Sequence, residues 1–507
     1  MNSMRGPTND TFTMRHFSTL LLFLGFTTAT LANNIEVSNI VLTDQDAGAE
    51  ETTIQFDLSW ENSWRISSGP GNYDAAWVFA KIRVGGSSWV TASLSGAGTL
   101  PTGATVDVVD GIGAFVYRSG DGSGDISFQS VQLVWDYGSN GIDPNAVVDV
   151  QVFALEMVYV PQGQFSLGTG GSGADNEIGE FYRVPHPFSF SRPPYSVTSE
   201  AAITVGTATN NLYYTTDAGE PGDQQGPIPA AFPKGYAAFY CSKYETSQAQ
   251  YVAFFNTLSQ SQKSALDITG TAGKNSDAEV NRNGVSWSGA GSASTSLPDV
   301  PVNYINNIIM LAYLDWAGLR PMTELEYEKA GRGPVDPVQD EYAWGTNSIY
   351  DEEYNVINLG QPNELITNPG EGTGNALYTL TLPTSGVITG PLRCGIFAAS
   401  AVNANREETG GSYYGIMELS GNLYERAITV GLPEGRAFTG QHGDGDITST
   451  GLHNVTGWPS TNRGIGYRGG SYANQAIFLR ISDRTDAATE LVGSNSRLGF
   501  RAVRSAN

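Results

Sequence analysis

The C-terminal segment, residues 467–504, constrains the fold more than any other part of the chain, because strand-like runs alternate there with irregular ones. Strands are predicted at residues 467–472, 479–484 and 498–504. Gly469 and Gly470 suit a tight turn or a close approach of two backbones. We expect the final strand to lie inside a core sheet, so that the loops 473–478 and 485–497 are presented from a rigid frame.

Residues 1–32 have the composition of a secretory signal peptide. Arg15 and His16 give a charged start, and residues 20–26 form an apolar run that is too short to span a membrane. Small residues precede the cleavage site that we expect after Ala32. The mature chain is therefore expected to be secreted, periplasmic or displayed at the cell surface, without an integral membrane segment.

The chain is strongly acidic, with a formal net charge of −24 and a pI of about 4.4. Such a charge repels phosphate backbones, so no nucleic acid is expected as a partner. The 61 glycines among 507 residues predict a turn-rich, β-rich architecture. The two cysteines, Cys241 and Cys394, could form a disulfide in an exported protein or remain two buried thiols, and the sequence leaves both alternatives open.

Residues 33–155 show mostly period-two alternation of apolar and polar residues. Seven short strands are predicted there, at 35–42, 53–60, 76–84, 89–94, 114–117, 131–135 and 147–153. Strands of this length, separated by clusters of Gly, Asp, Ser and Asn, are typical of a β-sandwich. No catalytic constellation is visible in this domain, so we interpret it as a spacer, an anchor or a surface for self-assembly.

Residues 156–507 mix helices with strands and are predicted to form a second domain. Ser247 and Thr323 each start a capping box ahead of an amphipathic helix. The segments 169–235 and 259–300 are rich in Gly, Ser and other loop-forming residues and are predicted to be loop insertions, the second of them a long exposed loop. The expected fold class is α+β, with an all-β sandwich in front of an α+β domain.

Six separated motifs in the second domain occur in the order of a known family. They are residues 244–251, residues 318–333, Trp344-Gly345, Gly421-Asn422 with Glu425, Arg468-Gly469-Gly470-Ser471, and Gly499-Phe500-Arg501. Together they resemble the formylglycine-generating enzyme, or sulfatase-modifying factor, family. The resemblance implies that residues 156–507 adopt the C-type-lectin-like fold of that family.

The resemblance also implies an active site whose reactive groups are missing here. Enzymes of the family oxidise a substrate cysteine with oxygen, using two thiols that bind copper(I), a soft ion that prefers thiolates. Counted from the Arg-Gly-Gly-Ser motif, those thiols correspond to Asn474 and Leu479, and only Ser471 is retained, as a vestigial family position. Cys241 and Cys394 match neither position. We therefore expect no copper, no catalytic residue and no formylglycine formation.

Calcium is the cofactor that the resemblance carries over to this chain. A family turn that binds Ca²⁺ corresponds here to the side chains of Glu418 and Glu425 and to the carbonyl groups of Gly421 and Leu423. Hard oxygen donors, two of them carboxylates, suit this ion. The alternative is that the two acids cap the backbone or face solvent.

The loops around the former catalytic position hold assorted side chains between regular flanks. This arrangement resembles the variable proteins of diversity-generating retroelements, several of which use the same lectin-like fold and display ligand contacts on a fixed scaffold. The candidate ligand-binding residues are Asn474, Gln475, Ile477, Phe478, Thr485, Asp486, Thr489 and Glu490. A degenerate pocket without a ligand is the alternative interpretation.

These observations favour an exported, non-catalytic protein that binds an extracellular protein or glycan through its C-terminal pocket. Two other functions stay open. One is an oxidoreductase of the family with a divergent mechanism. The other is a structural or assembly protein in which the β-sandwich dominates.

Overall fold

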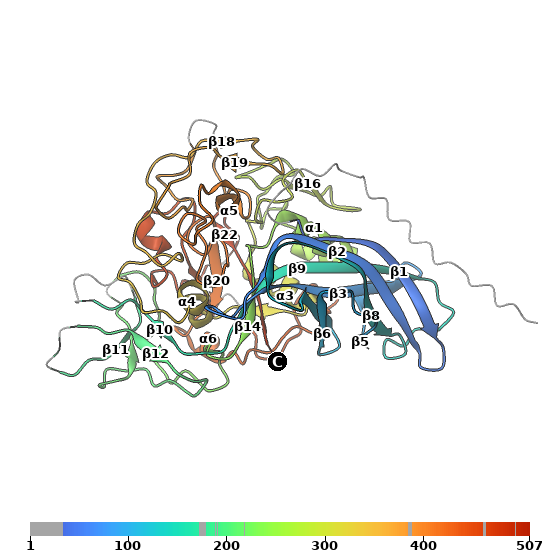
Figure 1. Cartoon of the computed structure of the whole chain (residues 1–507), viewed down its shortest axis with the longest axis horizontal. Helices are drawn as coiled ribbons and strands as arrows, with labels where there is room; N and C mark the ends of the chain where they lie inside the picture. Colours follow the sequence, from blue (N-terminus) through green and yellow to red (C-terminus); the bar gives the residue numbers. More distant parts are fainter. Residues whose placement is uncertain are drawn as a thin grey trace, which may run out of the picture.

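The computed structural model describes residues 34–171, 179–187, 189, 191–216, 218–383, 388–459, 463–491 and 493–506. Strands outnumber helices (Figure 1), and the chain is α+β, as expected. The predicted signal peptide, residues 1–32, lies outside the described residues. None of the described helices is both long and apolar enough to cross a membrane.

Two sheets pack face to face in the N-terminal part. The first is four-stranded, in the order β1 (Glu36–Asp46), β2 (Glu51–Arg65), β8 (Gly122–Asp136) and β5 (Leu94–Ala97). The second is eight-stranded and runs β17 (Arg320–Pro321), β23 (Ala502–Ser505), β14 (Phe239–Ser242), β9 (Val148–Val160), β3 (Asp74–Val84), β7 (Gly113–Arg118) and β6 (Ala104–Val109), with β4 (Val90–Thr91) paired to β3. The core between the sheets includes Phe56, Leu58, Val78 and Leu133. Alternation supplies this core, because every second side chain of a strand points inward.

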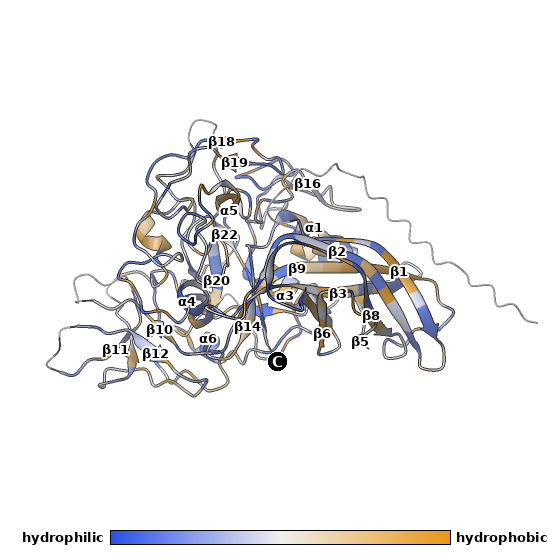
Figure 2. Ribbon diagram, viewed as in Figure 1, coloured by the Kyte–Doolittle hydropathy of each residue, from blue (hydrophilic) through white to orange (hydrophobic). Residues whose placement is uncertain are grey.

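Strand β9 joins the two parts of the chain. Its residues 148–158 pair with β3, and its residues 157–160 pair with β14. The domain boundary placed at 155/156 falls inside this strand, so both parts share one continuous sheet (Figure 1). The edge strand β1 alternates between polar and apolar residues, whereas β9 is mostly apolar (Figure 2). A strand inside a sheet that is covered on both faces needs this composition.

The C-terminal segment confirms one expectation and contradicts another. The final strand, β23, lies between β17 and β14, inside the core sheet. The strand predicted at 479–484 is wrong, because these residues form the end of a short 3₁₀-helix, η1 (Ala476–Leu479), and the turns after it. The alternation of this run does not mark a sheet face, since Ile481 to Arg484 are all buried.

Two helices cover one face of the eight-stranded sheet. They are α1 (Gln248–Thr257) and α3 (Asn307–Trp316), whose apolar side chains share a core with β3. Trp316 packs edge-on against Phe79, with 5.0 Å between ring centroids. Ser247 forms the expected capping box of α1, and Thr323 that of α4 (Glu324–Arg332). The remaining helices are α2 (Gln260–Leu266), α5 (Ile396–Ser400) and α6 (Pro433–Arg436).

Short strands complete the C-terminal part. A three-stranded sheet has the order β21 (Ile465–Arg468), β20 (Tyr424–Ile428) and β22 (Leu498–Gly499). Two-stranded pairs join β10 (Phe165–Leu167) to β12 (Tyr195–Val197), β11 (Tyr182–Arg183) to β13 (Leu212–Tyr213), β15 (Val285–Ser286) to β16 (Ser294–Thr295), and β18 (Val356–Ile357) to β19 (Leu365–Ile366). The segments 169–235 and 259–300 are therefore not simple exposed loops. Aromatic side chains such as Tyr214 and Trp287 are buried there, and their burial outweighs the loop-like composition.

Candidate functional site

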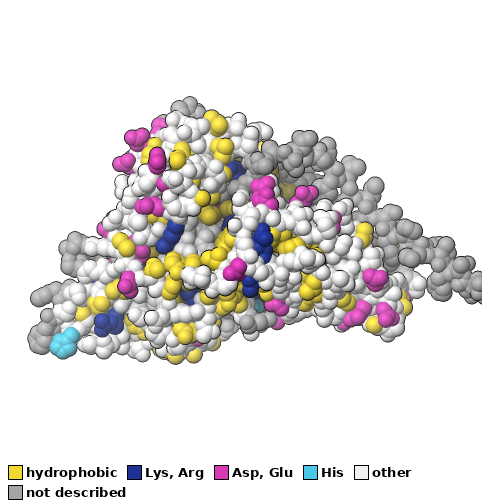
Figure 3. All heavy atoms as spheres, viewed as in Figure 1, with side chains coloured by type: hydrophobic (Ala, Val, Ile, Leu, Met, Phe, Trp, Pro, Cys, Tyr) yellow, Lys and Arg dark blue, Asp and Glu magenta, His cyan; other side chains and the backbone are white. Residues whose placement is uncertain are grey.

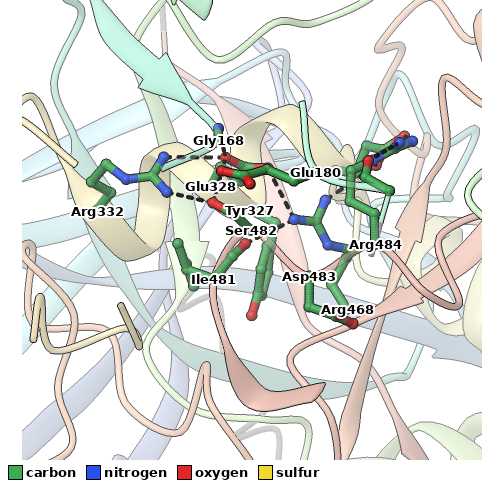
Figure 4. Close-up of polar contacts among 12 residues, drawn as sticks. Gly168, Glu180, Tyr327, Glu328, Arg332, Arg468, Ile481, Ser482, Asp483 and Arg484 are labelled. Carbon is green, nitrogen blue, oxygen red and sulfur yellow. Dashed lines mark hydrogen bonds and ion pairs between the residues drawn. The ribbon is translucent and has the colours of Figure 1, made fainter. Parts of the chain in front are cut away.

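A buried network of arginines and glutamates fixes the C-terminal segment to helix α4 (Figure 4). Arg468, at the end of β21, donates to Glu324 at 3.1 Å and to Glu328 at 3.0 Å. Arg484 donates to the two carboxylate oxygens of Glu324 at 2.7 and 3.0 Å. Arg332 lies on the other side of Glu328, at 3.1 Å. Each carboxylate is thus paired with two guanidinium groups. A buried charge needs such pairing to offset the loss of its hydration.

The segment 169–235 closes over this network and holds Arg484 from the other side. The guanidinium carbon of Arg484 lies 3.9 Å from the ring centroid of Phe181 and 4.3 Å from that of Tyr214. Its remaining N–H groups donate to the carbonyl oxygens of Gly179 at 2.9 Å and Pro221 at 3.0 Å. Burial is the largest influence on Glu324 and opposes its charge, but the guanidinium groups of Arg484 and Arg468 and the hydrogen bonds to this carboxyl together outweigh burial and lower its pKa. Ion pairing thus favours the ionised form of Glu324 inside the fold.

Ser471 begins a chain of hydrogen bonds at the vestigial catalytic position. Its hydroxyl donates to Asn474 Oδ1 at 2.5 Å, and Asn474 Nδ2 donates to the Tyr424 hydroxyl at 3.0 Å. Tyr424 in turn donates to Asp486 Oδ2 at 2.7 Å. Burial, and then the carboxylate of Asp486, raise the pKa of Tyr424, so it remains a neutral donor. Asn474 and Asp486 are thus brought together by one tyrosine of β20.

The second position where the family carries a thiol is part of the core. Leu479 is fully buried and packs with Trp344, Ala376 and Tyr378. Ser420 donates a hydrogen bond to its carbonyl oxygen at 2.7 Å. An aliphatic side chain in such a place offers neither a ligand nor a nucleophile. It supports the loop that precedes it.

Asp483 is an unusual acid beside the arginine network. It is 5 % exposed and accepts hydrogen bonds from the hydroxyl of Thr485 at 2.9 Å and from its N–H at 3.3 Å. Burial raises the pKa of Asp483 to about 7, although Thr485 and Arg468 partly oppose this. The group therefore changes its charge near neutral pH.

The predicted ligand-binding residues fall into two sets. Gln475 and Ile477 are exposed on or beside η1, Ile477 by 37 %, and Phe478 is half-buried there. The other set is engaged within the protein. The backbone of Thr485 accepts from Glu220 N at 2.6 Å, Thr489 donates to Asp486 at 3.3 Å, and Glu490 contacts Arg463 at 3.4 Å. Tyr424 links Asn474 of the first set to Asp486 of the second through two hydrogen bonds, and the ligand-binding role of the eight residues stays a prediction.

Two neighbouring residues extend the exposed set, and sequence reasoning missed them. Thr379 donates to the carbonyl oxygen of Asn474 through its N–H at 2.9 Å and its hydroxyl at 2.7 Å. Leu380, the next residue, is 60 % exposed. The run 378–382 alternates like a strand and carries no sequence signal of a surface role. Segments 378–382 and 473–478 are thus fastened together; we call them the rim segments.

The predicted calcium ligands lie in a buried turn. Glu418 accepts from Gly395 N at 3.0 Å, and Glu425 pairs with Arg501, while the second carboxylate oxygen of each is buried and has no hydrogen-bond partner among the described residues. Burial raises the pKa of Glu418 to about 7. The described residues include no group of three His, Cys, Asp or Glu side chains arranged for a metal. Two unpartnered carboxylate oxygens fit a hard cation completed by carbonyl groups, and calcium stays a prediction.

Both cysteines are free and fully buried, which confirms the second of the two alternatives. Cys394 donates to the carbonyl oxygen of Glu245 at 3.5 Å, and Cys241 to that of Ser242 at 3.6 Å. Burial raises the pKa of Cys241 to about 12, and burial also raises the pKa of Cys394. Neither thiol is accessible or ionised as a reactive cysteine would be.

The frame and the hydrogen-bonded Ser471 position define a rigid α+β domain that presents its C-terminal segment on a buried charge network. The chain matches the family model of the sulfatase-modifying factor enzyme 1-like domain over residues 194–506, more than half of its length, and it belongs to that family. It is also 32 % identical over 137 residues to a formylglycine-generating enzyme from Thermomonospora curvata. That match covers 27 % of this chain and 36 % of the relative, so the chain spans about a third of that relative's length.

Proposed function

We propose that this chain is an exported, non-catalytic member of the family that binds a ligand through the rim segments. One observation carries the proposal. The two positions where the resemblance places thiols hold Asn474 and Leu479, and both side chains are committed to the fold, one by hydrogen bonds and the other by burial. Neither can bind copper(I) as a thiolate does.

The exposed side chains support a binding role for the rim segments. Leu380 and Ile477 are 60 % and 37 % exposed, and Thr379 and Gln475 offer polar groups beside them. Apolar anchors among adaptable polar groups are typical of recognition surfaces on rigid scaffolds. The bonds from Thr379 to the Asn474 carbonyl oxygen hold the two segments in one arrangement, which lowers the entropy cost of binding.

Diversification by a retroelement is a further part of this proposal. Ser482, Asp483 and Arg484 are buried in the charge network and could not vary without loss of stability. Variation would be confined to exposed positions such as Gln475, Ile477 and Glu490. The proposal predicts a near-copy of the DNA that encodes residues 468–504 beside a reverse transcriptase gene. Without such a repeat, diversification is excluded and binding is not.

The test is a binding screen of the mature chain, residues 33–507, against a protein and glycan array. A hit should weaken about 10-fold or more with Leu380→Ser or Phe478→Ala, since interface anchors typically carry that much affinity. Val147→Ser removes a side chain that is 73 % exposed on the N-terminal part and should change nothing. Conversion of a peptide cysteine to an aldehyde under oxygen by the purified chain would overturn the proposal, and so would hits that both rim variants leave intact.

A further inference from the structure

Few basic side chains are fully exposed among the described residues, although several arginines are half-buried at the surface. The chain has 27 lysines and arginines, and among those that the structure describes only Arg463 is exposed. Arg463 itself contacts Glu434 at 2.9 Å and Glu490 at 3.4 Å. Figure 3 shows one face of the molecule, where basic side chains lie mainly near the middle and acidic ones lie both there and toward the edge. Among the fully exposed charged side chains of the described residues, carboxylates therefore predominate.

Exposed carboxylates flank the rim segments in particular. Asp351 and Glu352 are exposed on the stretch that precedes Tyr354. Two hydrogen bonds hold this stretch against rim segment 378–382, because Tyr378 donates its hydroxyl to the Tyr350 carbonyl oxygen at 3.0 Å and Tyr354 N donates to the Thr381 carbonyl oxygen at 3.1 Å. The acidic pair therefore lies beside Leu380 and is carried by ordered backbone.

Arg480 does not neutralise this acidic pair. Arg480 follows rim segment 473–478, but it is half-buried and pairs with Asp340 at 2.9 Å. Burial is the main cause of a raised Tyr378 pKa of about 12, with the charges of Tyr342 and Asp351 acting in the same direction. Asp351 and Glu352 therefore place exposed negative charge beside rim segment 378–382, whereas the half-buried Arg497 acts on Tyr424, the hydrogen-bond partner of Asn474 in the other rim segment.

We propose that the partner of the rim segments is a cationic polypeptide with an apolar anchor. This inference rests on the proposed function and names its ligand class. The apolar anchor would contact Leu380 and Ile477, and lysine or arginine side chains would lie against Asp351 and Glu352. An anionic glycan or an acidic protein is disfavoured, because the same carboxylates repel it. Surface complementarity of this kind raises the association rate and chooses the partner.

The experiment measures binding of three synthetic peptides to the full mature chain by fluorescence anisotropy. The peptides share length and apolar content and are cationic, neutral or anionic. The cationic peptide should bind most tightly, and its affinity should fall as salt rises. Asp351→Asn/Glu352→Gln should weaken it about 3- to 10-fold and reduce the salt dependence. Leu380→Ser/Ile477→Ser should weaken the cationic and neutral peptides alike, about 10-fold.

Matched controls separate a site from a general attraction to an acidic protein. Glu36→Gln/Asp107→Asn removes two exposed carboxylates from the N-terminal part and should leave affinity unchanged. Val147→Ser/Leu452→Ser removes side chains that are 73 % and 46 % exposed elsewhere and should also have no effect. Equal losses in the control and rim variants would overturn the inference. Binding of a glycan or an anionic peptide that depends on Leu380 would overturn the cationic partner and leave the proposed function standing.

Discussion

The two parts of this chain share a sheet, but different kinds of side chain fill their interiors. The largest fully buried side chains of the N-terminal part are tryptophans, Trp60, Trp77 and Trp135. In the C-terminal part they are mainly arginines, among them Arg332, Arg426, Arg468, Arg484 and Arg501. The first part is ordered by apolar side chains from alternating strands. The second has few strand residues to fix its backbone and is ordered by buried guanidinium groups instead.

Buried arginines explain how the C-terminal part can hold irregular loops in a fixed position. An arginine reaches several main-chain carbonyl groups at once, as Arg484 does with those of Gly179 and Pro221. Irregular backbone needs such partners, because its buried C=O groups are not paired with a neighbouring strand. The cost is that every buried charge depends on a matching carboxylate. Among the described residues of the sandwich, 34–155, only Asp74 and Lys81 are buried charged side chains, so the loss of a surface charge there should cost less than the loss of a buried one in the C-terminal part.

The largest difference is expected when Glu324 loses its charge. Glu324→Gln leaves the Arg484 guanidinium buried without a carboxylate, which should destabilise the chain by about 3–5 kcal/mol in denaturant unfolding. The matched change on the sandwich is Asp149→Asn, which breaks a pair with Arg83 at 2.7 Å on the surface. That loss should amount to about 0–1 kcal/mol. Equal effects of the two variants would mean that the network does not hold the C-terminal segment.

Calcium should stabilise the C-terminal part by a somewhat smaller amount. If Ca²⁺ completes the coordination of Glu418 and Glu425, an ion concentration 100 times its dissociation constant should add about 2.7 kcal/mol of stability. The melting temperature would then fall on treatment with EDTA and recover with Ca²⁺. Glu418→Gln should abolish the response and Glu36→Gln should not. A melting temperature that changes with neither EDTA nor Ca²⁺ would contradict the prediction that this turn binds calcium.

The sandwich was largely predictable from the sequence, and the candidate site was predictable only in part. Period-two alternation marks β2 because the facing sheet buries every second residue, whereas β3 and much of β9 are covered on both faces and appear as apolar runs. The same reasoning failed at residues 479–484, where the partners of Arg484 include Glu324, far away in the sequence. A local pattern cannot show such a partner. The motif around Ser471 identified the family position, whereas the exposure of Leu380 follows from a contact between two distant segments.

A smaller difference between the two parts is expected in the pH dependence of stability. Burial raises the pKa of Asp483 from 3.8 to about 7, so the folded chain binds this proton more tightly than the unfolded chain. Its contribution is complete below about pH 4 and is lost as pH rises to about 7. Asp483→Asn should therefore flatten the pH profile in that window. Asp107→Asn, an exposed acid of the sandwich, should leave the profile unchanged, and an unchanged profile in Asp483→Asn would show that the carboxyl is ionised in the fold.

The smallest effect is expected from acylation of the lysine amines, because few of them are accessible to the reagent. All six lysines are buried, and their ammonium groups tie loops together, as Lys329 does through the Pro161 carbonyl oxygen at 2.7 Å and Lys274 through that of Ala278 at 2.6 Å. Amine acylation should therefore modify the lysines of the folded chain slowly in both parts of the molecule. Peptide mass spectrometry would show which lysines have reacted. Lys263 and Lys274, at 7 % and 6 % exposure, should react first.

The order of reaction distinguishes burial from charge. Burial lowers the pKa of Lys81 and of Lys329 to about 8, which leaves more of the reactive neutral amine than an ordinary lysine has. If accessibility did not matter, these two would be acylated before Lys263. Their protection would show that the amines are enclosed by the fold. Denaturation should then expose all six lysines together if the two parts unfold as one unit, and Lys81 at a different denaturant concentration from Lys329 if the sandwich and the arginine-held part unfold separately.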